Sequence, residues 1–346
     1  MGELLVTMTM FVLLVLLAVV VFISWWATKL LIKVLLKHQI VDTPNDRSMH
    51  QGSVPRGGGI VIIACLLIAL ISVGMVSQRY HLFGALTILV LAWAVLSGWD
   101  DKHDLSARKR LLFQLLFAYL SIAALGYVST IQLSASSAVW LASFGAVATF
   151  ISIIGLANLY NFMDGMDGLA AAQTIVASVT MSFWFWQAGD PQLGIVCLVL
   201  GAASYGFLLH NWQPAKVFMG DIGSVTIGAF FALMIIFANT RYQIPVLSFV
   251  VLFGVFVFDA SVTMMRRLIR REKIWLPHRT HFYQRLALAG MDHSRVVIVA
   301  IVLMIFCSMI ASYTVIDHDR IAFGSILVLL VLACAAGFVV FKETQE

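Results

Sequence analysis

The chain has 346 residues, of which 61% are hydrophobic and only 11% are charged, with a net charge of +5. A soluble domain carries about 25% charged residues, so this chain has too little charge to cover a folded surface in water. The composition excludes a soluble enzyme, a disordered chain and a secreted disulfide scaffold. It indicates a membrane protein in which most residues contact lipid or other helices.

The apolar residues form long unbroken runs, and a membrane span needs roughly 20 such residues. The expected spans are 4–28, 57–77, 82–99, 111–128, 133–156, 169–188, 192–210, 223–239, 244–265, 296–315 and 321–341. The runs do not alternate at period 2, so helices are expected to cross the membrane and strands are not. The sequence predicts an all-α, polytopic membrane protein with about eleven transmembrane helices, in a single domain over residues 1–346.

The basic residues are divided unevenly between the two ends of the expected spans. If the loops alternate between two sides, 19 of the 22 lysines and arginines share one side, and only Arg79, Arg241 and Arg320 lie on the other. Cytoplasmic loops carry an excess of lysine and arginine. The sequence therefore predicts an N-terminus outside and a C-terminus in the cytoplasm. The positive charge is a topology signal, and no nucleic-acid binding is expected.

The predicted cytoplasmic side also holds 13 of the 17 carboxylates and seven of the nine histidines. Its second loop, Gly98–Ser106, begins with Asp100 and Asp101 at the end of an apolar run. Adjacent carboxylates repel one another and resist desolvation, so they favour a divalent cation or a bound cationic group. The alternative is a solvated helix end that is capped by Asp104 or Ser106.

The third inner loop, Asn158–Leu169, has two carboxylates, two carboxamides and two glycines, and no basic residue. Carboxylate and amide oxygens can bind a hard cation or contact a nucleobase. Glycine allows tight turns and close approach of the backbone to a ligand. Two Asp-Gly turns between apolar spans favour a functional loop, although such turns also occur in ordinary loops. The candidates are Asn158, Asn161, Asp164 and Asp167.

The fourth inner loop, His210–Ser224, places Asp221 directly before an apolar helix. The dipole and the free N–H groups at a helix N-terminus favour anions. Gly220 and Gly223 on either side, with Lys216 nearby, suggest a pocket for phosphate and metal. The alternative is that Asp221 is simply an N-cap of the helix.

The fifth inner loop, Arg266–Arg295, is the longest and most basic, and its Pro277–Arg285 segment holds two histidines and two arginines. These groups are suited to binding pyrophosphate or to proton transfer near neutral pH. A basic loop on anionic lipid is the alternative, which accounts better for Arg266–Lys273 than for Pro277–Arg285. The first inner loop contains Pro44–His50 and three glycines at 57–59, without the spacing of a P-loop.

All these groups are expected at one membrane face, at the depth of a lipid headgroup. Carboxylates, cationic side chains and glycine turns together fit Mg²⁺-assisted phosphoryl transfer. The nucleophile would be a lipid phosphate that reaches the site laterally from the bilayer.

At these residues the chain resembles the polyprenyl-phosphate N-acetylhexosamine-1-phosphate transferases of glycosyltransferase family 4, which include the MraY and WecA types. The matching stretches, in the family's order, are Asp100-Asp101, Asn158–Gly168, Asn211–Ser224 and Pro277–Gln284. The resemblance covers essentially the whole chain, because the predicted topology agrees as well.

Within this family, two segments look most like the branch that starts O-antigen or exopolysaccharide repeat units. They are Pro44–His50 with Pro55–Gly59, and the His-Arg-Thr-His-Phe-Tyr-Gln stretch from His278. The peptidoglycan branch has a histidine cluster, where this chain has only His278 and His281.

The resemblance implies transfer of an N-acetylhexosamine-1-phosphate from a UDP-sugar to undecaprenyl phosphate, with release of UMP. It implies Mg²⁺ as the cofactor, with Mn²⁺ as the alternative metal. It also implies a multi-pass protein of the bacterial inner membrane, in contact with membrane lipid, with its active site facing the cytoplasm. A homodimer is compatible with this resemblance.

Roles for individual residues are carried over by motif. Asp221 would coordinate Mg²⁺, and Asp100 and Asp101 would bind or deprotonate the lipid phosphate or help to hold the metal. The peptidoglycan branch has a lysine before its glycine turn, and Arg56 would replace it here.

The remaining positions would bind the substrates. The nucleotide pocket would be lined by Asn158, Asn161, Asp164 and Asp167. Asn211 and Phe218 would lie beside uracil and ribose. The pyrophosphate or sugar would contact His278, Arg279 and His281.

Alternatives remain within and outside this enzyme class. A phospho-MurNAc-pentapeptide transferase or a WecA-type GlcNAc-1-phosphate transferase would share the same motifs. An ion-coupled transporter would instead need carboxylates near the midpoints of its spans. Asp259 is the one carboxylate well inside an expected span, and the others collect at one face. A non-catalytic scaffold would not need three separate Asp-containing turns.

Overall fold

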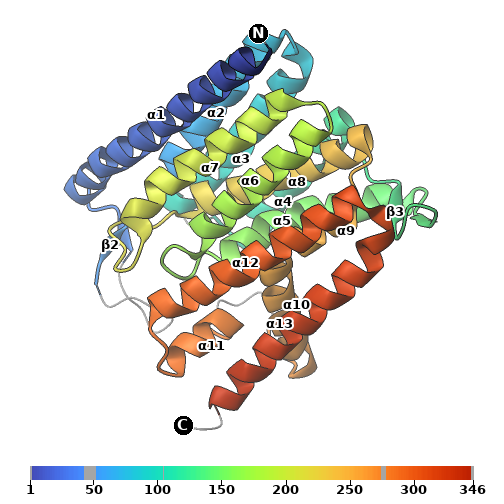
Figure 1. Cartoon of the computed structure of the whole chain (residues 1–346). Helices are drawn as coiled ribbons and strands as arrows, with labels where there is room; N and C mark the ends of the chain where they lie inside the picture. Colours follow the sequence, from blue (N-terminus) through green and yellow to red (C-terminus); the bar gives the residue numbers. More distant parts are fainter. Residues whose placement is uncertain (1, 43–51, 104, 274–277, 344–346) are drawn as a thin grey trace.

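A computed structural model describes residues 2–42, 52–103, 105–273 and 278–343 (Figure 1). This part of the chain forms 13 α-helices, one short 3-10 helix and two small two-stranded sheets. The helices are α1 (Gly2–Lys37), α2 (Gly59–Ser77), α3 (Tyr80–His103), α4 (Ala107–Leu125), α5 (Phe144–Phe162), α6 (Leu169–Gln187), α7 (Pro191–Asn211), α8 (Asp221–Tyr242), α9 (Val246–Leu252), α10 (Gly254–Ile269), α11 (Phe282–Leu288), α12 (His293–Ile316) and α13 (Ile321–Glu343). The all-α, polytopic architecture is confirmed.

Nine of the described helices are long and apolar enough to cross a membrane, and α9 with α10 forms a further, bent candidate. The helix at the predicted span 111–128 is α4, which begins earlier, at Ala107. Its first turn carries Arg108, Lys109 and Arg110, so it is less apolar than the other helices. With α4 and the bent pair included, each predicted span has a helix in the described part of the chain.

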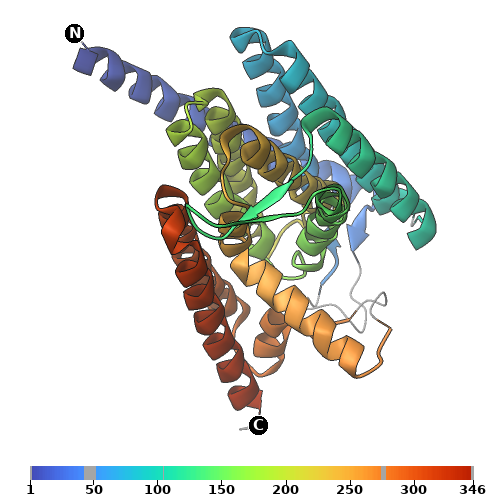
Figure 2. The same ribbon diagram turned by 90° about the vertical axis from the view of Figure 1, so that its right-hand side faces the viewer.

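Two predicted spans differ from the structure. Residues 133–156 do not form one helix, because β3 (Thr130–Gln132) and β4 (Ala138–Trp140) form an antiparallel hairpin before α5. Three of the five residues between the strands are serine, which favours turns. The predicted span 244–265 is likewise broken, by an 83° bend between α9 and α10. Figure 2 shows α10 running obliquely away from the helices around it.

The bend occurs at Gly254, where the missing side chain allows close packing. A Cβ at this position would lie 3.2 Å from a Val328 methyl carbon and 3.3 Å from the Cys307 sulfur. The glycine therefore lets α12 and α13 approach the start of α10 closely. From this bend α10 runs toward the inner loops.

The centre of the bundle is α8, the most buried of the candidate spans. It contacts α2, α3, α4, α5, α6 and α9. Aromatic rings fill the space beside it, with Phe231 next to Tyr160 and Phe253, and Tyr160 next to Phe256. The peripheral helix α1 instead exposes large apolar side chains such as Phe22 and Trp26, as expected for a surface in lipid. The start of α8 is therefore held at the middle of one face.

The opposite ends of the helices, which the sequence predicts to be the outer ones, are held together by the buried Asp190 carboxylate. It pairs with Arg79 at 2.8 Å and accepts a hydrogen bond of 2.5 Å from the Tyr242 hydroxyl. It also accepts a hydrogen bond from the Leu193 amide at the start of α7. A buried charge is stable only when it is paired and hydrogen-bonded, so this network holds three outer loops in place.

Candidate active site

The glycine run of the first inner loop joins the start of α2 to the start of α8. The amides of Gly57 and Gly58 donate to the Phe218 carbonyl at 3.2 and 2.8 Å, and the Gly59 amide donates to the Met219 carbonyl at 2.9 Å. A Cβ at Gly59 would lie only 2.4 Å from the Gly223 Cα. Only glycine therefore lets the two helix starts cross so closely, directly beside Arg56.

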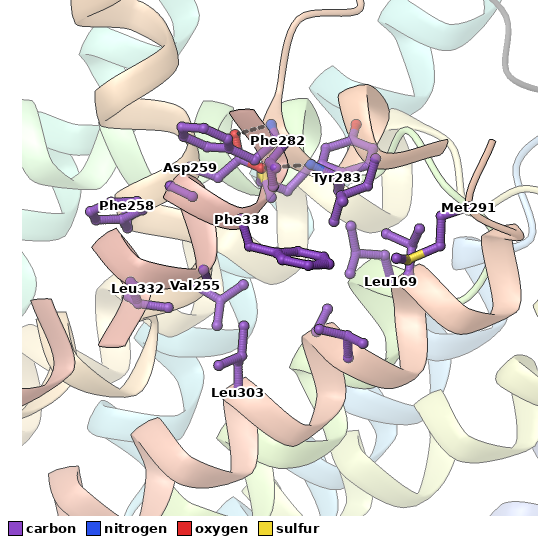
Figure 3. Close-up of a pocket in the computed structure, with 18 residues that line it drawn as sticks. Leu169, Val255, Phe258, Asp259, Phe282, Tyr283, Met291, Leu303, Leu332 and Phe338 are labelled. Atoms are coloured by element: carbon purple, nitrogen blue, oxygen red, sulfur yellow. Dashed lines mark hydrogen bonds between the residues drawn. The ribbon is translucent and has the colours of Figure 1, made fainter. Parts of the chain in front are cut away.

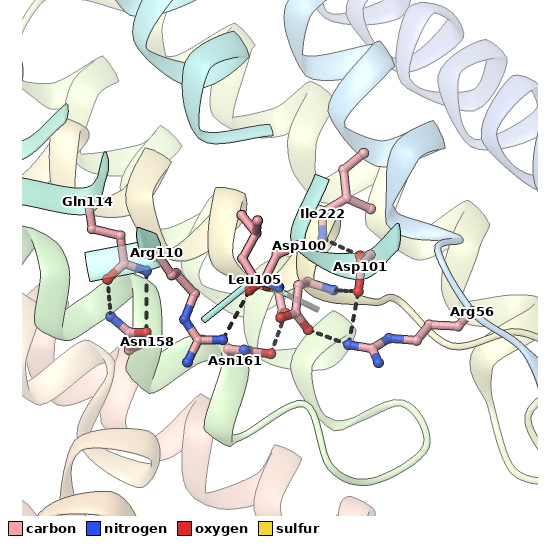
Figure 4. A network of polar contacts seen from close by, with 11 residues as sticks. Arg56, Asp100, Asp101, Leu105, Arg110, Gln114, Asn158, Asn161 and Ile222 are labelled. Carbon is pink, nitrogen blue, oxygen red and sulfur yellow. Dashed lines mark hydrogen bonds and ion pairs between the residues drawn. The ribbon is translucent and has the colours of Figure 1, made fainter. Parts of the chain in front are cut away.

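Arg56 bridges two of the predicted aspartates (Figure 4). Its Nη2 atom lies 2.5 Å from Asp221 Oδ1 and 2.9 Å from Asp101 Oδ1. Asp101 also accepts hydrogen bonds from the amides of Asp221 and Ile222, at 3.2 and 2.9 Å. These are the first amides of α8, so Asp101 caps this helix from α3. The N-cap of α8 is Gly220, so Asp221 is the first residue of the helix, and its side chain is directed to Arg56.

The predicted aspartate pair is divided between two environments. Asp100 accepts the Leu105 amide at 2.9 Å and pairs with Arg110 at 3.0 Å. Successive residues of an α-helix point about 100° apart, so Asp100 faces α4 while Asp101 faces α8. Asp100 thus holds the connection from α3 to α4, and only Asp101 joins the Arg56 bridge.

The two asparagines at the end of α5 are divided in the same way. Asn161 accepts a hydrogen bond of 3.1 Å from the Ser224 hydroxyl, one turn into α8. Asn158 instead exchanges hydrogen bonds with the Gln114 side chain of α4, at 3.0 and 3.4 Å. The Asn161 side chain of α5 therefore contacts the start of α8, whereas the Asn158 side chain links α5 to α4.

Asp164 lies close enough to the bridge to interact with its charges. Burial, followed by the negative charge of Asp221, raises the pKa of the Asp164 carboxyl well above its usual range. Within the described residues, this carboxyl accepts no hydrogen bond from another group, so it is available to a ligand.

Asp167 and Asn211 hold the third and fourth inner loops against each other. Asp167 accepts the Ala215 amide at 2.9 Å. Asn211 is buried, accepts the Gly168 amide at 3.0 Å and donates to the Val217 carbonyl at 2.9 Å. Both side chains therefore position the backbone next to Phe218, which is half-buried. Their predicted contacts with the nucleotide stay predictions.

The fifth inner loop is anchored by Asp259, a residue that the sequence motifs did not assign to the site. Its Oδ1 atom lies 2.9 Å from His281 Nδ1. The His278 ring lies beside His281 at a tilt of 33°, with ring centroids 4.9 Å apart, and Arg279 is exposed. The usable signal for Asp259 was its position inside a span, since ionisable groups at membrane depth are functional by default.

The fifth loop contacts the third through Tyr283, whose hydroxyl donates to the Phe162 carbonyl at 3.2 Å. Arg266 holds the loop backbone by donating to the Thr280 carbonyl at 2.6 Å, and Arg267 donates to the Lys273 carbonyl at 2.9 Å. These arginines, expected to lie on anionic lipid, thus also shape the loop. The predicted motif residues 44–50, 104 and 277 lie outside the described residues.

The first, second and fourth inner loops therefore meet at Arg56, Asp101 and Asp221, with the third beside them and the fifth in contact with the third. The described residues contain no group of three or more histidine, cysteine or acidic side chains placed to hold a metal ion. Mg²⁺, however, is commonly bound by one or two carboxylates together with water and substrate phosphates. Asp221 and Asp101, with Asp164 nearby, supply oxygen donors of that kind, so the residues fit such a cation.

Comparisons with known proteins identify a family for this chain. Residues 82–239 match the model of a family described as glycosyl transferase family 4. This stretch runs from α3 to α8 and includes every predicted site residue between Asp100 and Asp221.

Three similar bacterial proteins carry related names. A probable undecaprenyl-phosphate N-acetylglucosaminyl 1-phosphate transferase of Bacillus subtilis is 29% identical, over 79% of this chain and 76% of its own length. An undecaprenyl-phosphate alpha-N-acetylglucosaminyl 1-phosphate transferase of Yersinia pestis is 29% identical, over 75% and 72%. A phospho-N-acetylmuramoyl-pentapeptide-transferase of Lacticaseibacillus paracasei is 30% identical, over 59% and 68%. The motifs, the membrane fold and these relatives together show that the chain belongs to glycosyl transferase family 4.

Proposed function

We propose that this chain transfers an N-acetylhexosamine-1-phosphate from a UDP-sugar to undecaprenyl phosphate and releases UMP. An oxygen of the lipid phosphate would form a bond to the phosphorus that bears the sugar, while the bond from that phosphorus to UMP breaks. The observation that carries the proposal is the Arg56 bridge between Asp101 and Asp221, at the inner ends of α2, α3 and α8. The names of the relatives support the polyprenyl-phosphate acceptor.

The bridge offers both kinds of group that phosphoryl transfer needs. The Arg56 guanidinium can donate to phosphate oxygens, and such contacts favour the charge of a pyrophosphate. Asp221 is the proposed ligand of Mg²⁺ or Mn²⁺, with Asp101 and Asp164 beside it. The bound metal would neutralise phosphate charge. The first two amide groups of α8 already donate to Asp101, so substrate phosphates would meet the Arg56 side chain instead, and the Asp221 carboxylate would be left to hold the metal.

An apolar cavity supports access for a lipid. It has a volume of about 350 Å³ and lies between α5, α8 and α9, lined by residues such as Ile153, Leu156, Ile235 and Phe253. At its inner end it reaches Leu159, which is two residues before Asn161. A polyprenyl chain in this cavity would place its phosphate near the start of α8.

The proposed pathway is the start of a lipid-linked repeat unit, as in O-antigen synthesis, from the resemblance of the first and fifth inner loops to that branch. The proposed location is the bacterial inner membrane with the site in the cytoplasm, supported by the 19 basic residues on the inner side. The transporter alternative is weakened, because Asp259 is used to hold the fifth loop.

The test incubates membranes that carry the protein with undecaprenyl phosphate, Mg²⁺ and a panel of UDP-sugars. UMP release and lipid-linked product would be measured for the wild type and for Asp221→Asn, with Asp317→Asn at the outer face as the matched control. Loss of even a partner of a metal ligand costs on the order of 10–100-fold, so Asp221→Asn should lose at least that much. Turnover that survives removal of divalent cations, or an unaffected Asp221→Asn, would contradict the assignment.

A further inference from the structure

Asp259 lies in the N-terminal half of α10, and the start of α11 packs around its buried carboxylate (Figure 3). Its Oδ1 atom accepts hydrogen bonds from the Phe282 amide at 3.0 Å and the Thr263 hydroxyl at 3.1 Å. The same atom lies 2.9 Å from His281 Nδ1. Its Oδ2 atom accepts the Tyr283 amide at 3.3 Å.

We propose that Asp259 is a positioning residue that holds the fifth inner loop over the site, so that Arg279 can meet the phosphates of the UDP-sugar. The proposal rests on the proposed function for the identity of that substrate. It also assigns His281 to the anchor and not to direct contact with the substrate.

The burial of Asp259 makes its contacts hard to replace. Below it lies an apolar pocket of about 210 Å³ between α10, α11, α12 and α13, with Leu303, Leu332 and Phe338 in its lining. An unpaired polar group in such surroundings is costly, because no water is available to satisfy it. An amide at this position would present an NH₂ group to the surrounding donors, so asparagine cannot reproduce the contacts of the carboxylate.

The other basic side chains of the His278–Arg285 segment already have partners. His281 is 4% exposed, contacts Asp259 and stacks on Tyr283. His278 Nδ1 lies 3.0 Å from the Thr280 hydroxyl. Arg285 pairs with Glu343 at the end of α13. Arg279 is exposed and makes no contact of this kind with the described residues, so it is the charge that the segment offers to a ligand.

The anchor is also connected to the carboxylates of the third loop. A Cβ at Gly165, next to Asp164, would lie 2.3 Å from the Tyr283 hydroxyl oxygen. The Tyr283 amide is itself held by Asp259. A change at Asp259 should therefore displace Arg279 relative to the Arg56 bridge, without altering any group in that bridge.

The experiment compares Asp259→Asn, Asp259→Glu and Arg279→Ala with Asp190→Asn in purified full-length protein. Asp190 is the matched control, because it is a buried carboxylate with several partners at the outer face. We expect Asp259→Asn and Arg279→Ala each to raise KM for the UDP-sugar about tenfold, as expected when a charge-assisted contact is lost. KM for undecaprenyl phosphate should not change. Asp259→Glu should restore part of the loss, and Asp190→Asn should lower Tm without changing either KM.

Two further measurements test whether Asp259 and Arg279 act through the same contact and whether Asp259 holds the loop. The double variant Asp259→Asn with Arg279→Ala should have a KM for the UDP-sugar no higher than that of the more impaired single variant. The reason is that both changes remove the same contact. Tryptic cleavage after Arg279 should be faster in Asp259→Asn than in the wild type or Asp190→Asn, and this readout does not need the reaction.

The outcomes separate the two proposals. If the wild type makes no lipid-linked product with any UDP-sugar, the proposed function fails, while the cleavage rate still tests the anchor. If the wild type is active, the positioning role is overturned by an unchanged KM in folded Asp259→Asn. Additive effects in the double variant, or equal KM changes in Asp190→Asn, would overturn it as well.

Discussion

His278 lies half-buried in the fifth inner loop, and its environment disfavours the protonated ring. Burial, followed by its neighbours His281 and Arg267, lowers the pKa of His278 to about 4. A histidine in an unfolded chain titrates near 6.5. Between these two values the unfolded state binds the proton more tightly, so His278 lowers the free energy of unfolding as the pH falls through this window. Above about pH 6.5 it has no such effect.

We therefore expect Tm of the wild type to fall between about pH 7 and pH 5, and to fall less in His278→Gln. The measurement is thermal unfolding in detergent at matched ionic strength. His38, at the inner end of α1, is exposed, so His38→Gln is the control and should follow the wild type. An equal decline in all three proteins would show that His278 does not titrate in this window.

Neighbouring residues of one type have separate roles in this site. The sequence could therefore not predict the role of each individual residue. The motifs correctly placed Asp101 and Asp221 together, but they could not show that Asp100 turns to Arg110. The direction of each aspartate depends on where α3 ends and on the partner that α4 supplies. Asp259 stands out in the sequence as a charge inside a predicted span. Its contact with His281, 22 positions away, could not be predicted without knowing the fold.

At the scale of elements, the crossing of α2 and α8 is fixed by glycine. We expect Gly59→Ala to lower stability by about 1–3 kcal/mol or more, because the new methyl group would meet the backbone of Gly223. Activity should fall with it, since the same crossing carries Arg56 and Asp221. Thermal unfolding and UMP release measure the two effects.

The matched control is Gly84→Ala in α3, where a Cβ would meet nothing within 4 Å. Alanine favours a helix over glycine by roughly 0.5–1 kcal/mol, so this variant should be as stable as the wild type or slightly more so. If both substitutions were tolerated equally, the close crossing would not be needed for the site.

The misplaced elements share a physical cause. Hydropathy identifies apolar segments, and it identified both 133–156 and 244–265 correctly as apolar. It does not report whether such a segment forms one continuous helix, a hairpin before a shorter helix, or two helices with a bend between them. The hairpin at β3 and β4 satisfies its own backbone groups, and the bend at Gly254 depends on the close approach of α12 and α13.

In the whole molecule, charged groups connect the helices differently at the two ends of the bundle. The outer end is joined by one compact network around Asp190, whereas the inner end holds several acidic and basic groups in contact between loops. The Arg56 bridge joins segments that are distant in sequence, and the other inner contacts join helices that follow one another along the chain. The bundle therefore positions the site through the ends of its helices, and the segregation of basic residues predicts which end is cytoplasmic.

Labelling of single cysteines tests this orientation. The four native cysteines, Cys65, Cys197, Cys307 and Cys334, would first be replaced. Ser136→Cys then marks the turn between β3 and β4, and Lys109→Cys marks the start of α4; both positions are exposed. A membrane-impermeant maleimide added to intact spheroplasts should label Ser136→Cys, and it should label Lys109→Cys only after permeabilisation. The inverse pattern would place Arg56, Asp101 and Asp221 outside the cell, where no cytoplasmic UDP-sugar could reach them, and it would contradict the proposed function along with the orientation.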